Sequence, residues 1–334
     1  MSYSGKESDQ WDPSMSLFSP SSFDLDKIWS FLAYDIWEAG ADPRVSEFPL
    51  MKGGPWWVIA VIAGWLYFVK VSGPRLMKDR PAYDLRRLIL VYNMVMMATN
   101  AYFFISASSY TNFGLKTWGC TNVNPSDWGT TMKFKLLLIW FFFISKFIDL
   151  LETVFFVLRK KHGQISFLHV FHHSIVPIDV WVGFKYSPSE SACFFPLINS
   201  LVHTLMYLYY GLSTLGPAVR PYLWWKPYLT QLQIFQLVLV AIHCVHLMLI
   251  PDCNIPKAVF AIYLPQVMLL VYLFVSFFIH NYVLSKSKSK QQTIMNGIEK
   301  SGGVKMECRN SAKTNVTEQV KKQQCVSDQE KKYL

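Results

Sequence analysis

Charged residues are scarce in this 334-residue sequence, and long stretches contain no Asp, Glu, Lys or Arg at all. Only 16% of the residues are charged, whereas 52% are hydrophobic and 16% are aromatic. In a soluble domain, about a quarter of the residues are charged. Uncharged windows of this length, repeated along the chain, are very hard to cover with a water-facing surface, which argues against one large soluble globule.

Seven windows of the sequence are apolar enough and long enough to cross a bilayer. A transmembrane helix needs roughly 20 mainly apolar residues, and its backbone polar groups are satisfied within the helix. The predicted spans are residues 55–72, 88–107, 134–157, 166–184, 192–214, 229–250 and 258–283. We therefore predict an all-α integral membrane protein with seven transmembrane helices. Its parts are an N-terminal segment (1–54), a seven-helix domain (55–284) and a tail (285–334).

A cleavable signal peptide is also missing from the sequence, because residues 1–30 have no apolar core. The first span is therefore expected to act as the insertion signal. Cations are concentrated in the first, third and fifth connections: Lys70, Arg75, Lys78, Arg80, Arg86 and Arg87, then Arg159, Lys160 and Lys161, then Arg220 and Lys226. The positive-inside rule places these connections and the tail in the cytosol, and the N-terminal segment in the lumen.

The tail is polar, poor in aromatic residues and basic, so we expect it to be disordered. It ends in KKYL, and Lys331 and Lys332 resemble the dilysine retrieval signal of endoplasmic reticulum membrane proteins. The formal net charge of +10 comes largely from this tail and the cytosolic loops. In a polytopic chain this charge favours anionic lipid headgroups or phosphorylated ligands, rather than nucleic acid, as partners.

The six cysteines include no CxxC pair. Cys120 and Cys253 fall in the second and sixth connections, on the predicted lumenal side, where disulfides can form. A bridge would tie the second and third spans to the sixth and seventh, but a sequence does not reveal the Cα separation that a disulfide requires. Cys308 and Cys325 fall in the tail and are expected to be free thiols.

Four consecutive predicted spans carry polar stripes at helical spacing. The stripes are Lys146, Asp149 and Glu152 with Thr153; His169, His172 and His173; Asn199, His203, Tyr207 and Tyr210; and Thr230, Gln233 and Gln236. Residues three or four apart share one helix face. Ionisable groups inside a span usually face the bundle interior and mark a functional site, although an ion pair can also serve only to hold helices together. Together the four stripes indicate an enclosed polar core.

The clustered histidines suit two chemistries. Neutral imidazoles bind iron or zinc, and the HxxHH spacing occurs in membrane di-iron desaturases and hydroxylases. Those enzymes need several histidine boxes, whereas the remaining histidines here, apart from His203, are dispersed: His162, His243, His246 and His280. An imidazole that is buried in its neutral form is also suited to proton transfer and nucleophilic attack.

The chain resembles the ELO family of very-long-chain fatty acid elongases in four ordered motifs: SKFIDLLETVFFVLRKK, FLHVFHH, NSLVHTLMYLYYG and YLTQLQIFQ. DPRVSEFPLM and GPRLMKDRPAYDLRRLILVYN, on either side of the first span, resemble the same family. The likeness covers roughly residues 35–285. The family usually reads Lys-x-x-Glu-x-x-Asp-Thr in the third span, whereas Asp149 and Glu152 exchange the two acids here.

The resemblance implies a seven-helix bundle in the endoplasmic reticulum membrane that encloses a narrow substrate tunnel. It implies an acyltransferase, a very-long-chain 3-oxoacyl-CoA synthase, which condenses malonyl-CoA with a long-chain acyl-CoA and releases CO₂ and CoA. The implied partners are these two substrates, membrane lipid, and the 3-oxoacyl-CoA reductase, 3-hydroxyacyl-CoA dehydratase and enoyl-CoA reductase of the elongation cycle. A homodimer stays open. No cofactor and no metal are expected.

Roles for the polar residues follow from this implied reaction. We expect His172 to attack the acyl thioester and form an acyl-histidine, because Cys193 and Cys244 lie apart from the stripes. A variant without a covalent intermediate, in which His172 or His203 is a general base, stays open. The expected catalytic set is His172, His203, His169, His173, Lys146, Asp149, Glu152 and Asn199, and the expected substrate-binding set is Tyr207, Gln233, Gln236, Arg159, Lys160, Lys161 and Lys226.

The four cations in the substrate-binding set are placed to meet the phosphates of CoA, although topology alone would also put cations there. Two other functional classes remain open. A di-iron lipid oxidoreductase would contain iron, and a seven-helix transporter or receptor would form no malonyl-CoA-dependent product.

Overall fold

A computed structural model describes residues 29–120, 129–251, 253 and 255–284. All regular secondary structure in these ranges is helical, with no strand, as predicted. The main helices are α3 (Trp56–Tyr67), α5 (Arg86–Thr111), α6 (Thr130–Asp149), α7 (Leu151–Leu158), α8 (Phe167–Tyr186), α9 (Phe194–Thr214), α10 (Lys226–Leu249) and α11 (Lys257–Phe278). Shorter helical elements are η1 (Phe31–Asp35), α2 (Ile36–Glu38), η2 (Val45–Glu47), η3 (Phe68–Ser72), α4 (Gly73–Met77), η4 (Leu115–Trp118), η5 (His162–Gln164), η6 (Ser191–Cys193), η7 (Arg220–Tyr222) and η8 (Ile279–Leu284).

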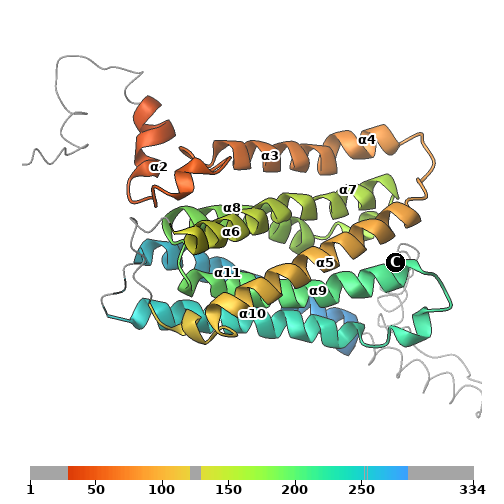
Figure 1. Ribbon diagram of the computed structural model, residues 1–334. Coiled ribbons are helices and arrows are strands. Elements are labelled where there is room, and N and C mark those ends of the chain that lie inside the picture. Colours follow the sequence, from red (N-terminus) through yellow and green to blue (C-terminus); the bar gives the residue numbers. More distant parts are fainter. Residues whose placement is uncertain (1–28, 121–128, 252, 254, 285–334) are drawn as a thin grey trace, which may run out of the picture.

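The main helices lie lengthwise beside one another and form a bundle (Figure 1). α5 packs along α9, α10 contacts both α9 and α11, and α8 contacts α6 and α11. α3 and α4 lie along one edge, where they contact α8 and α7 respectively. The four helices that carry the predicted polar stripes therefore belong to one bundle.

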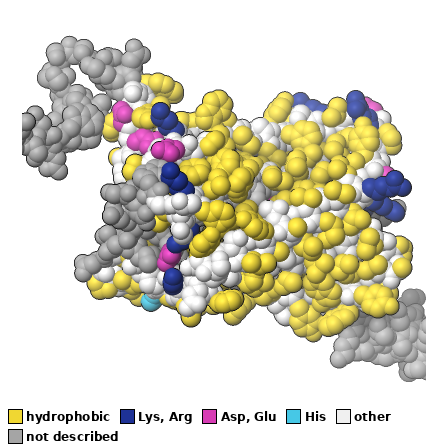
Figure 2. Space-filling model, viewed as in Figure 1, with side chains coloured by type: hydrophobic (Ala, Val, Ile, Leu, Met, Phe, Trp, Pro, Cys, Tyr) yellow, Lys and Arg dark blue, Asp and Glu magenta, His cyan; other side chains and the backbone are white. Residues whose placement is uncertain are grey.

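The two ends of the bundle differ in charge. One end, called the basic end here, carries the connections with Arg75, Lys78, Arg80, Arg86, Arg87, Arg159, Lys160, Lys161, Arg220 and Lys226. The opposite end, called the disulfide end, carries the Cys120–Cys253 bond. Hydrophobic side chains cover most of the visible surface between the ends, and charged side chains gather at the ends (Figure 2). An apolar band between charged ends matches a bilayer's apolar core between its polar interfaces.

Among the described residues, five helical segments are long and apolar enough to cross a membrane: Trp56–Met77, Arg86–Thr111, Ser191–Thr214, Lys226–Leu249 and Lys257–Leu284. These segments correspond to five of the seven predicted spans. The other two, 134–157 and 166–184, are helical as α6–α7 and α8 but are not among the five. Their apolar sequence is interrupted by the charged and histidine side chains of the two polar stripes.

Local sequence determines how α8 begins. Ser166 is its N-cap, and the Ser166 hydroxyl oxygen accepts a hydrogen bond from the backbone N–H of His169 at 3.2 Å. Pro177 lies inside the helix and has no N–H, so the backbone carbonyl of His173 loses its helical partner. The clustered histidines thus occupy the first two turns, between a cap and a proline.

The segment that precedes α3 is fastened to the other end of α8. Lys185 Nζ lies 3.0 Å from Glu38 Oε1 and donates to the backbone carbonyl of Met51 at 2.7 Å. Trp181 Nε1 donates to the backbone carbonyl of Leu50 at 2.9 Å. Residues more than 130 positions apart are joined here, so the N-terminal segment helps to fix α8.

Glu38 is the centre of this attachment. Its Oε1 also accepts from the N–H of Gly53 at 2.5 Å, and its Oε2 accepts from the Ser46 hydroxyl at 2.9 Å. Burial alone would raise the pKa of the Glu38 carboxyl, but these hydrogen bonds and the Lys185 ammonium outweigh it. The net effect is a lowered pKa, which keeps Glu38 ionised.

Cys120 and Cys253 form a disulfide, with Cα atoms 5.6 Å apart, and the two residues are 133 positions apart in sequence. The bond joins the chain after η4 to the connection between α10 and α11. Cys308 and Cys325, Lys331 and Lys332, and the whole tail lie outside the described residues.

Candidate active site

The helix is interrupted at Leu150, between α6 and α7, and the acidic residues Asp149 and Glu152 lie on either side of the interruption. Trp65 Nε1 on α3 donates to the backbone carbonyl of Leu150 at 3.1 Å. The Tyr92 hydroxyl on α5 donates to the backbone carbonyl of Ile148 at 3.2 Å. Neither Trp65 nor Tyr92 was predicted as a site residue, because an aromatic residue in an apolar span does not show in the sequence which distant carbonyl it meets.

Lys146 and Asp149 form a buried ion pair that connects α6 to α9. Lys146 Nζ lies 3.0 Å from Asp149 Oδ2 and 3.4 Å from Asn199 Oδ1. The Tyr207 hydroxyl donates to the other carboxylate oxygen of Asp149 at 2.7 Å. All four side chains are buried. Because both oxygens of Asp149 are occupied, its charge is compensated and the ammonium of Lys146 is held in one position.

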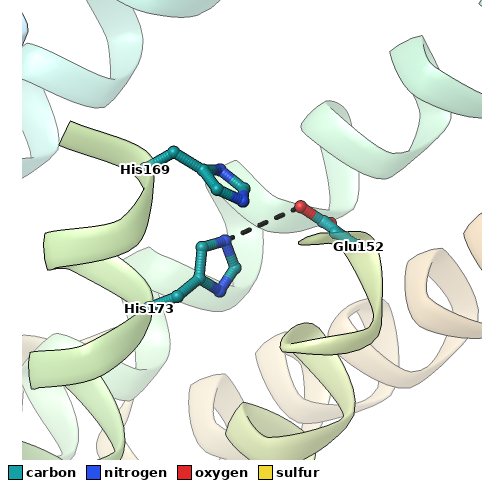
Figure 3. Close-up of side chains that lie close together, drawn as sticks. All are labelled: Glu152, His169 and His173. Carbon is teal, nitrogen blue, oxygen red and sulfur yellow. Dashed lines mark ion pairs between the residues drawn. The ribbon is translucent and has the colours of Figure 1, made fainter. Parts of the chain in front are cut away.

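His169 and His173 on α8 face Glu152 on α7 (Figure 3), and Thr153 on α7 lies beside His169. His169 Nε2 lies 2.8 Å from the Thr153 hydroxyl oxygen, and His173 Nε2 lies 3.7 Å from Glu152 Oε2. The two imidazole rings are 4.3 Å apart between centroids. Glu152 Oε1 is buried and has no hydrogen-bond partner among the described residues. Thr153 therefore orients His169 through a hydrogen bond, whereas Glu152 lies beside His173 at a longer distance and keeps one oxygen available within the described part.

His172 and His203 differ from His169 and His173 in hydrogen bonding, because a ring nitrogen of each has no hydrogen-bond partner among the described residues. The His172 ring lies against His173 and Phe274, at 5.2 and 6.5 Å between centroids, and no hydrogen bond joins its imidazole to a described residue. His203 Nδ1 is buried and also has no partner in the described part. The His203 ring lies 5.8 Å from that of Tyr207 between centroids. Ring nitrogens without a protein partner can meet a substrate.

These residues define what is called the polar cluster from here on: Lys146, Asp149, Glu152, His169, His172, His173, Asn199, His203 and Tyr207. The α10 stripe adds Gln236, which is buried with no partner for Oε1 among the described residues. Gln233 Nε2 donates to Met206 Sδ at 3.4 Å and so faces α9. The Tyr210 ring lies 6.4 Å from that of Tyr207.

The structure does not bring the four predicted substrate-binding cations into the polar cluster. Arg159, Lys160 and Lys161 follow α7, and Lys226 begins α10, all at the basic end. Lys160 Nζ donates to the backbone carbonyl of Lys78 at 3.3 Å. Lys160, Lys161 and Lys226 are exposed.

Glu152, His169 and His173 could also hold a metal ion, since one ligand atom from each lies within 4.8 Å of the others. A carboxylate with imidazoles suits iron or zinc. Of the remaining dispersed histidines, two bind carbonyl oxygens of η4 at 2.9 and 2.8 Å, and two are exposed: His243, His246, His162 and His280. The several boxes of a di-iron enzyme are not assembled among the described residues.

An apolar cavity lies beyond the polar cluster, toward the disulfide end. Its empty volume is about 890 Å³, opening included. The four helices that carry the polar stripes line this cavity one or two turns beyond the cluster, and α11 completes the wall. Each helix contributes at least one lining residue: Ile139 on α6, Asp179 on α8, Pro196 on α9, Val240 on α10 and Tyr263 on α11. The thiols of Cys193 and Cys244 also line this cavity and lie outside the cluster.

Comparison with known proteins identifies the family. Residues 50–291 match the model of the ELO family, described as the GNS1/SUR4 family. The chain is 39% identical over 264 residues to human very long chain fatty acid elongase 1, which covers 78% of this chain and 94% of the relative. It is 38% identical over 248 residues to the mouse elongase 1, covering 74% and 88%.

A third relative comes from a fly, whereas the first two come from mammals. Very long chain fatty acid elongase 7 of Drosophila melanogaster is 37% identical over 264 residues, which is 79% of each chain. The matched region contains every residue of the polar cluster. The chain therefore belongs to the ELO family.

Proposed function

We propose that this chain condenses malonyl-CoA with a long-chain acyl-CoA to a 3-oxoacyl-CoA two carbons longer. Family membership and the relatives' names support fatty acid elongation by an acyltransferase. The observation that carries the proposal is the polar cluster, in which ring nitrogens of His172 and His203 have no hydrogen-bond partner among the described residues and lie beside the fixed Lys146–Asp149 pair. Such a site can bind, position and protonate reacting carbonyl groups.

In the first step of the proposed mechanism, a ring nitrogen of neutral His172 attacks the carbonyl carbon of the acyl thioester. The C–S bond breaks, CoA leaves as a thiolate, and an acyl-imidazolium remains. Malonyl-CoA then loses CO₂, and the electron pair of the broken C–C bond forms an enolate. The enolate attacks the acyl carbon, the C–N bond breaks, and the 3-oxoacyl-CoA leaves a neutral imidazole.

Lys146, Asn199 and His203 are the proposed donors for the enolate oxygen. Donors that are fixed before the reaction are the most effective, because no reorganisation is needed as charge develops. Asp149 and Tyr207 hold Lys146, and Glu152 and Thr153 orient His173 and His169. In the variant without a covalent intermediate, His172 or His203 acts only as a general base.

We further propose that α6–α7 and α8 cross the membrane with the other five segments, which gives seven spans around a tunnel. The apolar cavity would hold the acyl tail, since each buried methylene contributes about 0.8 kcal/mol. The basic end would face the cytosol, where Arg159, Lys160, Lys161 and Lys226 meet CoA phosphates. The N-terminal segment would be lumenal, and the membrane would be that of the endoplasmic reticulum.

The product needs a reduction, a dehydration and a second reduction to become a saturated acyl-CoA. Close association with the 3-oxoacyl-CoA reductase, the 3-hydroxyacyl-CoA dehydratase and the enoyl-CoA reductase is therefore part of the proposal, whereas a homodimer stays open. The retrieval role proposed for Lys331 and Lys332 concerns residues outside the described part.

The test is expression in microsomes with radiolabelled malonyl-CoA and a panel of acyl-CoAs. The parent chain should form labelled 3-oxoacyl-CoA, and His172→Ala should lose it, whereas His162→Ala, at an exposed histidine, should not. Undiminished product from His172→Ala would remove His172 from the mechanism.

A di-iron oxidoreductase is the second candidate, favoured only by the arrangement of Glu152, His169 and His173. Metal analysis of the purified protein separates the two. Iron bound in stoichiometric amount, with no malonyl-CoA-dependent product, would replace condensation by oxidation.

A further inference from the structure

Asp179 is an unpaired carboxyl group in the apolar cavity. It lines the cavity from α8, and its Oδ1 is buried with no hydrogen-bond partner among the described residues. No ion pair in that part of the chain involves it either. A carboxyl group removed from water is unfavourable unless it finds a polar partner.

The surrounding side chains do not supply that partner. The nearby Tyr263 hydroxyl donates to the backbone carbonyl of Asp179 and not to its carboxyl group. Gly183 permits this contact, since a Cβ atom there would lie 2.7 Å from the Tyr263 hydroxyl oxygen. A second buried hydroxyl on the cavity wall, Ser187 Oγ, is also unpaired within the described part. The cavity therefore has hydrogen-bonding capacity that a purely hydrocarbon tail would leave unused.

Asp179 and His172 lie on the same face of α8, because seven residues make nearly two full turns. They are separated by roughly 10 Å along the helix axis. A zigzag chain of bonds about 1.5 Å long advances about 1.2 Å per carbon. An acyl chain that starts at His172 and follows α8 toward the disulfide end would therefore pass Asp179 about eight carbons from its carbonyl.

We propose that Asp179 binds a hydroxyl group in the middle section of the acyl chain, so that the site accepts mid-chain hydroxyacyl-CoA. The inference rests on the proposed function and names a substrate class for it. A carboxyl group in its neutral form both donates and accepts, and an alcohol complements it in both roles. A site built to hydrogen-bond a hydroxyl group discriminates against an analogue that lacks it.

The experiment measures kcat/KM for 10-hydroxystearoyl-CoA and for stearoyl-CoA with malonyl-CoA, using the full chain in lipid nanodiscs. The readout is the ratio of the two values. Asp179→Leu should lower this ratio about tenfold or more, and Asp179→Asn, which keeps a donor and an acceptor, should preserve it within about threefold. Cys244→Val, a change on the same cavity wall, should leave the ratio unchanged. A 2-hydroxy isomer should give a ratio that does not depend on residue 179.

A readout that needs no turnover covers variants that lose activity. 10-Hydroxystearoyl-CoA should raise the unfolding temperature of the parent chain more than stearoyl-CoA does, and Asp179→Leu or Asp179→Ala should abolish the difference. Equal ratios and equal shifts in parent and Leu variant, with stearoyl-CoA still elongated, would overturn the role of Asp179 alone. No malonyl-CoA-dependent product from any acyl-CoA would instead overturn the proposed function.

Discussion

Both ends of α8 carry buried polar groups, and the two sets differ in how completely they are paired. At the disulfide end, the Lys185 ammonium meets Glu38 and the Met51 carbonyl, and both oxygens of Glu38 are occupied. In the polar cluster, Asp149 is equally well paired, but Glu152 Oε1 and His203 Nδ1 are not, in the described part of the chain. A saturated network stabilises a structure, whereas a buried group with unused hydrogen-bonding capacity can meet a substrate.

Removing Glu38 tests the structural half of this contrast. Glu38→Leu leaves the fully buried Lys185 ammonium without its counter-ion, which should lower the free energy of unfolding by ~3–5 kcal/mol. Thermal unfolding in detergent measures the loss, with the exposed Glu47→Leu as the matched control. Turnover per folded molecule should stay within about twofold of the parent. A large fall in turnover at unchanged stability would place Glu38 in the reaction.

Lys146 tests the chemical half. Lys146→Met should lower kcat by about 10²–10³-fold, because one fixed donor to the developing negative charge is lost. Labelled malonyl-CoA incorporation at saturating acyl-CoA is the assay, and the exposed Lys70→Met is the control. An unchanged kcat would mean that the Lys146–Asp149 pair only holds α6 in place.

The disulfide should matter for stability but not for chemistry. Replacing both Cys120 and Cys253 with Ser should lower the free energy of unfolding by ~2–4 kcal/mol. Unfolding of the parent chain with and without reductant provides a second measurement. If the double variant is as stable as the parent, the bond does not contribute to holding α10 and α11 against η4.

Tyr207 should give a smaller effect, since it acts through Asp149. Tyr207→Phe removes one hydrogen bond to the carboxylate, and the expected loss is about 0.5–1.5 kcal/mol, or roughly two- to tenfold in kcat. The loss should appear in kcat more than in KM, because the position of Lys146 is affected rather than acyl binding. Tyr210→Phe, one turn away, should have less effect.

Acid should weaken the attachment of the N-terminal segment. The folded-state pKa of Glu38 is lowered below its ordinary value of 4.5, so its stabilising contribution is fully present above that value. It is lost as the pH falls through the lowered pKa. The difference in unfolding temperature between the parent and Glu38→Leu should therefore shrink below about pH 4.5. A constant difference down to pH 3 would contradict this.

Periodicity in the sequence predicted the helices and the stripes on them. The span predicted at 166–184 is α8 from Phe167 to Tyr186, and the one at 192–214 contains α9 from Phe194 to Thr214. Spacing along one helix also predicted that Lys146 and Asp149 share one face, where the structure pairs them. Such local patterns follow from residues three or four positions apart.

Contacts between distant residues could not be predicted in this way. The break at Leu150, the hydrogen bonds from Trp65 and Tyr92, and the Glu38–Lys185 pair all depend on which helices are neighbours. Asp179 is a single polar residue without a stripe, so its unpaired state became visible only in three dimensions. The charged stripe makes α6–α7 less apolar than the other spans, and the histidines do the same for α8. Length and apolar composition alone therefore do not identify these two segments as spans.

The decisive measurement is a single turnover with acyl-CoA in the absence of malonyl-CoA. Attack by His172 predicts one equivalent of CoA released per active chain, and a mass increase equal to the acyl group on the peptide that contains His172. His172→Ala should show neither. No CoA release until malonyl-CoA is added, with normal product formation afterwards, would contradict nucleophilic attack and leave the histidines as acids and bases only.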